Sequence, residues 1–172
     1  MNVDELGEAL KQSMIATTYK EAQLGRSLRY MSQQVQEKFK KELFRSIPKL
    51  VKKVDNGSLR NDEIRNEIKL VSKKSGCSAG QSQKAINVYL KVYCLFNSNP
   101  VKETIVELDC PLDSKIMSKY KTKNLKKKYL KDMNFEDYLA WQKHVEAVGV
   151  GIRIATDMIY DKNRVNEFLK NP

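Results

Sequence analysis

A lysine and an aspartate near the middle of the chain combine reactive side chains with local settings that favour chemistry. Lys84 falls in the first turn of a helix predicted from about residue 81 to residue 96. The positive end of a helix macrodipole disfavours an ammonium there and favours a nucleophilic amine. Asp113 follows Pro111 at the start of another predicted helix, where exposed backbone N–H groups favour an ionised carboxylate. A surface lysine and a helix N-cap are the structural alternatives, and the sequence leaves them open.

Other catalytic and metal-binding chemistries lack the residues that they need. His144 is the single histidine, so a Ser–His–Asp relay and a histidine metal site have no raw material. The three cysteines cannot complete a four-thiolate cluster and form no C-x-x-C pair, and no G-x-x-x-x-G-K-[ST] phosphate loop occurs. We therefore expect no metal and no cofactor, with His144 at the surface or partly buried on a helix.

Positive charge is concentrated directly after Asp113. The 172 residues include 32 Lys and Arg against 21 Asp and Glu, a formal net charge of +11, which indicates an anionic partner such as nucleic acid. Residues 115–131 contain eight lysines and no acid, and Leu125 and Leu130 can anchor them to a core. Lysine supplies charge without the geometry that reads bases, so this segment predicts a salt-sensitive grip on a phosphate backbone; a solvated loop is the alternative. The lysines assigned to DNA contact are Lys115, Lys119, Lys121, Lys123, Lys126, Lys127 and Lys128.

The elements that must position these residues are predicted to be helices. Helical periodicity dominates, and 41% apolar residues suffice for a core and exclude disorder, so we expect a compact all-α domain of several helices. Pro48 is expected to bend or end the second helix, and Gly76 to cap the third. Residues 101–108 stay ambiguous between a short strand and a helical turn. The expected helices cover residues 3–16, 18–47, 60–74 and 81–96, with another opened by Pro111.

The last long segment carries an apolar seam with alternating spacings of three and four, which predicts one continuous helix. Within it, residues 149–155 also spell the G-h-G-x-x-x-A of a helix–hairpin–helix, a motif whose backbone N–H groups hold a DNA phosphate. Because the seam keeps its phase through the glycines, we expect close packing against another helix rather than a hairpin. The seam consists of Tyr138, Trp141, Val145, Val148, Ile152, Ala155 and Ile159.

Two short patches resemble the helix–hairpin–helix DNA glycosylases. Residues 80–90 are similar to the family's hairpin and following helix, roughly G-h-G-x-K-x-A-x-x-h-h, with Lys84 on the lysine of bifunctional members. Residues 110–116 are similar to the family's h-x-h-D-[ST]-x-h segment, which carries the essential aspartate, here Asp113. The chain departs from the pattern where Ser82 replaces a glycine and Gln81 a hydrophobic residue, and its gap between Lys84 and Asp113 is longer than in most members. Residues 1–56 do not align with the family.

The resemblance implies an enzyme that flips a damaged or modified base out of DNA and cleaves its N-glycosidic bond, in repair or in defence against phage. Asp113 would stabilise the sugar cation, and Lys84 would attack the anomeric carbon in a bifunctional enzyme or help to hold the base in a monofunctional one. The hairpin residues assigned to phosphate or base contact are Gly80, Gln81, Ser82 and Gln83. The alternatives are a non-catalytic helical DNA- or RNA-binding protein and a helical interaction module that docks through the apolar seam.

Domain organisation and location follow from the same features. We expect one helical domain over residues 1–172; the alternative is two lobes, about 1–56 with the C-terminal helix and 57–132 with the hairpin and basic segment. Few, unevenly spaced cysteines indicate a reducing compartment, and the sequence contains neither a signal peptide nor an apolar stretch that could span a membrane. A cytoplasmic protein with double-stranded DNA as its partner is therefore expected.

Overall fold

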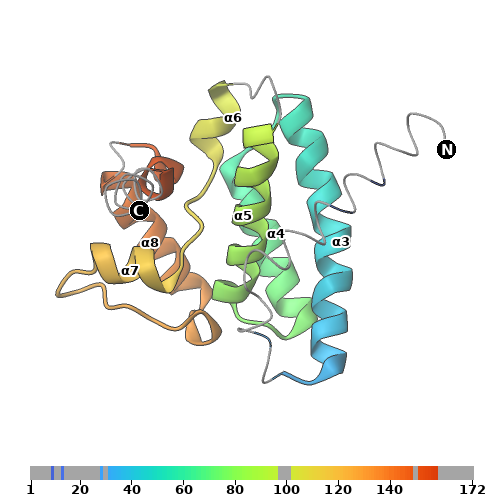
Figure 1. Ribbon diagram of the computed structural model, residues 1–172, viewed down its shortest axis with the longest axis horizontal. Helices are drawn as coiled ribbons and strands as arrows, with labels where there is room; N and C mark the ends of the chain where they lie inside the picture. Colours follow the sequence, from blue (N-terminus) through green and yellow to red (C-terminus); the bar gives the residue numbers. More distant parts are fainter. Residues whose placement is uncertain are drawn as a thin grey trace, which may run out of the picture.

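The computed structural model describes residues 31–96, 102–148 and 151–158, together with Ala9, Ser13 and Leu28. All regular secondary structure in these ranges is helical, which confirms the predicted all-α class (Figure 1). The elements are α3 (Gln33–Asp55), α4 (Asn61–Ser75), α5 (Ala79–Phe96), α6 (Lys102–Glu107), α7 (Ser114–Tyr120), the 3-10 turn η1 (Leu130–Asp132) and α8 (Phe135–Val148). Residues 153–158 are also helical.

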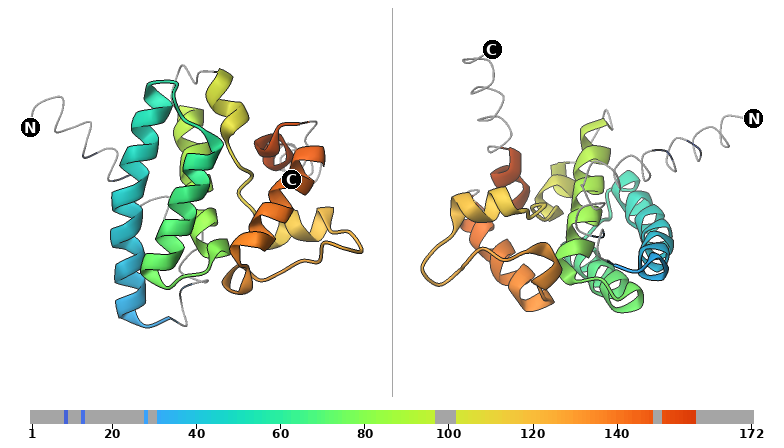
Figure 2. Two further views of the ribbon diagram at one scale, coloured as in Figure 1. Left: turned by 180° about the vertical axis from the view of Figure 1, so that it is seen from behind. Right: turned by 60° about the horizontal axis from the view of Figure 1, so that its bottom comes forward.

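Three long helices, α3, α4 and α5, lie side by side and form the larger part of the core (Figures 1 and 2). Each turns an apolar stripe inward, with Phe39 of α3, Ile64 and Ile68 of α4 and Ile86 of α5 fully buried. The segment from α6 to α7 runs between α5 and α8 (Figure 1). This arrangement places residues 108–113 between the three long helices and the C-terminal part of the described chain.

Helix α3 continues through Pro48 to Asp55, so the expectation that the helix ends at Pro48 is wrong. Proline removes one helical hydrogen bond and crowds the preceding turn, at a cost of about 3 kcal/mol. Beyond it, Leu50, Val51 and Val54 are buried against the core. Each such burial contributes roughly 1.5–3 kcal/mol, which outweighs the local cost and extends the helix.

The boundaries of α4 and α5 follow from local capping. Gly76 ends α4 with φ of 80°, the left-handed conformation that glycine adopts without strain, as the sequence predicts. Helix α5 begins at Ala79 rather than at residue 81, because Ser78 and Gln81 cap it reciprocally. The Gln81 N–H donates to Ser78 Oγ at 3.1 Å, and the Ser78 N–H donates to Gln81 Oε1 at 2.9 Å. The ambiguous residues 101–108 contain helix α6 and no strand among their described positions.

The C-terminal seam is interrupted, so the prediction of one continuous helix is wrong. Helix α8 ends at Val148, Gly151 adopts φ of 85°, and its N–H donates to Glu146 O at 2.8 Å before helical residues 153–158 begin. A left-handed glycine with this bond is a helix C-terminus, which the phase of the apolar seam did not reveal. Tyr138, Trp141 and Val145 of the seam are buried in the protein's own core.

Several predicted features lie outside the described residues. These are most of the helix expected over residues 3–16, nearly all of residues 18–30, the stop at residues 97–100, and residues 149, 150 and 159 of the glycine motif and seam.

Candidate functional site

The two residues singled out from the sequence meet in the structure. Lys84 Nζ lies 3.3 Å from Asp113 Oδ2, although one residue comes from α5 and the other from the turn before α7. The lysine side chain is 14% exposed and the aspartate side chain 32%, so the pair is partly shielded but reachable from solvent. Two side chains that lie 29 positions apart in the sequence are therefore neighbours in the fold.

The two carboxylate oxygens of Asp113 make different contacts. Oδ1 accepts from the Lys115 N–H at 2.8 Å and from the Ile116 N–H at 2.9 Å, which makes Asp113 the N-cap of α7. Oδ2 faces Lys84. The helix begins at Ser114, so the expectation that Pro111 opens it is wrong; Pro111 is buried upstream of the cap.

The surroundings of Asp113 keep it ionised. Burial acts to raise the pKa of this carboxyl, but the Lys84 ammonium and the N–H groups of Ile116 and Lys115 outweigh burial and leave the pKa below its ordinary value. An anion held in this way can stabilise positive charge that develops next to Oδ2.

Lys84 is the sixth residue of α5, because the helix starts at Ala79. It lies in the second turn rather than the first, and since the macrodipole effect fades within the first turn, that reason for a reactive amine is weaker than predicted. Lys84, Asn87 and Lys91 do share one face, as the spacing predicts. Along it, Asn87 Nδ2 donates to the Tyr138 hydroxyl at 3.4 Å, and Lys91 Nζ lies 2.6 Å from an oxygen of Asp157.

Two buried glutamines fix the irregular segment that leads to Asp113. Gln83 of α5 donates to Leu112 O at 2.8 Å and accepts from the Leu112 N–H at 3.2 Å. Gln142 of α8 donates to Cys110 O at 2.7 Å and accepts from the Cys110 N–H at 2.9 Å. Each amide thus pairs with one backbone unit as a neighbouring strand would, and it satisfies groups that would be costly to bury unpaired. Sequence reasoning did not single out Gln142; a glutamine inside an apolar seam was the available signal.

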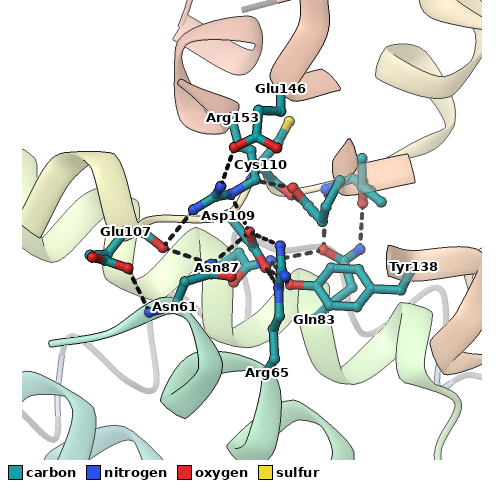
Figure 3. A network of polar contacts seen from close by, with 12 residues as sticks. Asn61, Arg65, Gln83, Asn87, Glu107, Asp109, Cys110, Tyr138, Glu146 and Arg153 are labelled. Atoms are coloured by element: carbon teal, nitrogen blue, oxygen red, sulfur yellow. Dashed lines mark hydrogen bonds and ion pairs between the residues drawn. The ribbon is translucent and has the colours of Figure 1, made fainter. Parts of the chain in front are cut away.

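A second cluster centres on Asp109, whose side chain is fully buried (Figure 3). Arg65 of α4 donates to it from Nε at 3.0 Å and from Nη2 at 3.1 Å, and Arg153 Nε lies 2.6 Å away. Asn61 Nδ2 donates at 2.8 Å, and the Tyr138 hydroxyl donates to Oδ2. The sequence analysis identified none of these contacts, which join α4, α8 and the helical residues 153–158 around one carboxylate.

The Tyr138 hydroxyl is held in its protonated form. Burial, and then the adjacent Asp109 carboxylate, raise the pKa of Tyr138 well above its ordinary value. The cluster therefore contributes hydrogen bonds and charge pairing, and we treat it as the structural support of the segment that carries Asp113.

The four residues assigned to a DNA-contacting hairpin lie inside the fold. Gly80, Gln81, Ser82 and Gln83 are buried in the first turns of α5. A Cβ on Gly80 would lie 2.7 Å from Met133 Cβ, and the Gly80 N–H donates to Met133 O at 3.2 Å. Ser82 Oγ donates to Ser78 O at 3.0 Å. Because their polar groups face protein atoms, we assign these four residues no contact with DNA.

The lysines of the basic segment, in contrast, are exposed. Leu125 and Leu130 are partly buried against the core and anchor the segment, as expected. Lys128 Nζ lies 2.7 Å from an oxygen of Asp137, a surface pair of small energetic value. The seven lysines that the sequence analysis assigns to DNA contact all have exposed side chains: Lys115, Lys119, Lys121, Lys123, Lys126, Lys127 and Lys128.

No family model, curated protein or solved structure matches the chain.

Within the described residues, no group of three or more His, Cys, Asp or Glu side chains could hold a metal ion, and no helix is long and apolar enough to cross a membrane. His144 is half-buried, with Nε2 2.7 Å from Tyr120 O and its ring edge-on to Trp141. Its surroundings are those of a packing residue, as the sequence predicts.

Proposed function

We propose that the protein is a DNA N-glycosylase in which Asp113 and Lys84 act at the sugar of a flipped nucleotide. The observation that carries this proposal is the 3.3 Å contact between Lys84 Nζ and Asp113 Oδ2. The two patches that resemble glycosylase motifs contribute one side chain each to this contact, and the exposed lysines begin at Lys115, two residues after the carboxylate.

The chemistry needs an anion and a nucleophile on one side of the sugar. As the bond between C1′ and the base breaks, the sugar gains positive charge, which the Asp113 carboxylate stabilises. Asp113 also lies within hydrogen-bond distance of Lys84 and can relay the proton that the ammonium must lose to the departing base, so that Asp113 is again a carboxylate as the sugar gains charge. The amine then forms a bond to C1′ while the base departs with the electrons of the broken bond and with that proton. In a monofunctional enzyme, water takes the place of the amine.

The exposed lysines would supply affinity for the duplex rather than recognition of the base. Lysine contacts to phosphates are independent of sequence and weaken as salt rises. Extrusion of the target base costs a few kcal/mol, least for a damaged base, and this cost contributes to selectivity.

Base release from modified duplexes tests the catalytic role. The purified protein is incubated with duplexes that carry single oxidised, alkylated or hypermodified bases, and alkali then reveals abasic sites as strand breaks. We expect Asp113→Asn to bind the duplexes with unchanged affinity and to lose base release, because asparagine retains the N-cap but not the charge. An Asp62→Asn variant, which removes an exposed carboxylate from the first turn of α4, is the matched control and should remain active.

Borohydride trapping tests the nucleophile. We expect a covalent complex between protein and DNA in the wild type and in the surface variant Lys52→Gln, but none in Lys84→Gln. Base release without any trapped complex would assign the attack to water and limit Lys84 to a positioning role.

A non-catalytic nucleic-acid-binding protein is the second candidate. It is favoured by the shielding of Lys84, whose ammonium already pairs with Asp113, and by the exposure of the seven lysines assigned to DNA. Salt-dependent binding with no base released from any of the duplexes would support it. The third alternative, docking through the apolar seam, gains no support, because Tyr138, Trp141 and Val145 are buried within the chain's own core.

A further inference from the structure

An open groove lies between the C-terminal half of α4 and the residues around η1, where the basic segment ends. Its volume is about 420 Å³, and its lining includes Ala79, the first residue of α5, and Ser78, which precedes it. Three lysines from distant parts of the chain border it: Lys69 and Lys73 of α4, and Lys131 of η1. Neither the candidate catalytic pair nor the lysines assigned to DNA from the sequence contribute to this lining.

The lining is positively charged and accessible. All three lysines are exposed, none forms an ion pair with another described residue, and Asp132 is the only acid of the lining, so its net charge is +2. Lys69 Nζ lies 5.6 Å from the ring centre of Phe135, which restricts the side chain at the groove. Helix α5 has 18 residues, and its N-terminus adds partial positive charge beside Ser78.

The groove is too open to enclose a base, since pockets for planar ligands are concave and bury most of the ligand's surface. Lysine is a point charge that binds phosphate without demanding one geometry. Asn134 Oδ1 accepts from the Asp137 N–H at 2.8 Å, and its Nδ2 group remains a possible donor to a phosphate oxygen. Lys131 is also the last of the eight lysines that follow Asp113. A nucleic-acid backbone that contacts these lysines can therefore extend to the groove.

We infer that this groove binds consecutive phosphate groups of a nucleic-acid backbone, with one phosphate contact each from Lys69, Lys73 and Lys131. The inference rests on the nucleic-acid partner of the proposed function but not on its catalysis. A free phosphate compound has the same chemistry as a backbone phosphate, and the experiment has a separate arm for it.

The salt dependence of duplex binding tests the site. Each phosphate contact contributes about 0.9 to the slope of log K against log salt concentration, so Lys73→Gln combined with Lys131→Gln should lower that slope by about 2. The control combines Lys41→Gln with Lys52→Gln, exposed lysines of α3, which contributes nothing to the lining. The control removes the same charge and should leave the slope unchanged. Equal slopes in the groove variant and the wild type would overturn the inference.

Amide NMR shifts distinguish the two sources of phosphate. Duplex DNA should perturb the amides of Lys73, Ala79 and Lys131 in the wild type, and inorganic pyrophosphate should do so only weakly. Saturation by pyrophosphate with no response to duplex would contradict a backbone site. If the groove variant lowers the slope by about 2 but no duplex releases a base, the catalytic proposal fails and the phosphate site is supported. If duplexes release a base but the slope is unchanged in the groove variant, the phosphate site fails and the catalytic proposal is supported.

Discussion

Replacing Asp109 by asparagine should strongly destabilise the protein, because this carboxylate is fully buried between two arginines. Asparagine has the same shape and can keep contacts with neutral neighbours, but it leaves Arg65 and Arg153 without their shared anion. Breaking a buried pair in this way typically costs 3–5 kcal/mol. Arg65 is 28% exposed and Arg153 retains Glu146 at 2.7 Å, so both charges keep some compensation. We therefore expect a loss of about 3 kcal/mol.

Urea unfolding followed by circular dichroism measures this loss. A protein of this size has a stability of roughly 5–15 kcal/mol, and with a slope of about 2 kcal/mol per molar the midpoint should fall by about 1.5 M. Asp55→Asn is the control, since Asp55 is exposed and accepts one hydrogen bond, from the Tyr93 hydroxyl at 2.6 Å. It should cost less than about 1 kcal/mol. A midpoint shift for Asp109→Asn no larger than that of the control would refute the role given to the cluster.

Three further predictions concern packing, pH and the thiols. Gly80→Ala should lower the free energy of unfolding in urea by about 1–3 kcal/mol, because the new Cβ would collide with the Leu130 carbonyl. In the control Gly76→Ala the Cβ meets open space, so this variant should cost only the strain of its positive φ, about 1 kcal/mol. Equal losses in the two variants would contradict the close contact at Gly80. The lowered pKa of Asp113 stabilises the fold at pH values above the unfolded pKa of about 3.9, and this contribution disappears as pH falls through the lower pKa of the folded state. Wild type should therefore lose more stability between pH 5 and pH 2 than Asp113→Asn. Parallel losses in the two proteins would argue against a lowered pKa of Asp113. All three cysteines are buried, and burial raises the pKa of Cys94 to about 11. A thiol reagent at pH 8 should therefore label the native protein slowly and the denatured protein at once. Fast labelling of the native protein would count against the burial of the thiols.

Features set by nearby residues could be predicted from the sequence. Gly76 ends α4 because a left-handed C-cap needs only glycine and the turn before it. Asp113 was placed correctly at a helix start, although the cap itself rather than Pro111 defines that start. The shared face of Lys84 and Lys91 follows from helical spacing alone.

Features that depend on distant residues could not be predicted in the same way. Whether a helix continues through Pro48 depends on what packs beyond it, and the balance of several buried side chains outweighs one local cost. At Gly151 the opposite holds, because an apolar seam describes two helices on one core as well as it describes one. Asp109 looks unremarkable between Leu108 and Cys110, since its partners come from α4 and from residues 153–158.

The glutamine pairs of the segment before Asp113 have a consequence for substitution. Gln83 and Gln142 bind the peptide groups of Leu112 and Cys110, not their side chains. Any apolar residue that fits the core at positions 110 and 112 would therefore keep the same polar contacts. The glutamines have no such freedom, because glutamate lacks the amide donor and would face a carbonyl oxygen with a negative charge. The position of the Asp113 carboxylate is thus set by Gln83 of α5 and Gln142 of α8. The apolar side chains at positions 110 and 112 can vary, whereas these two glutamines cannot.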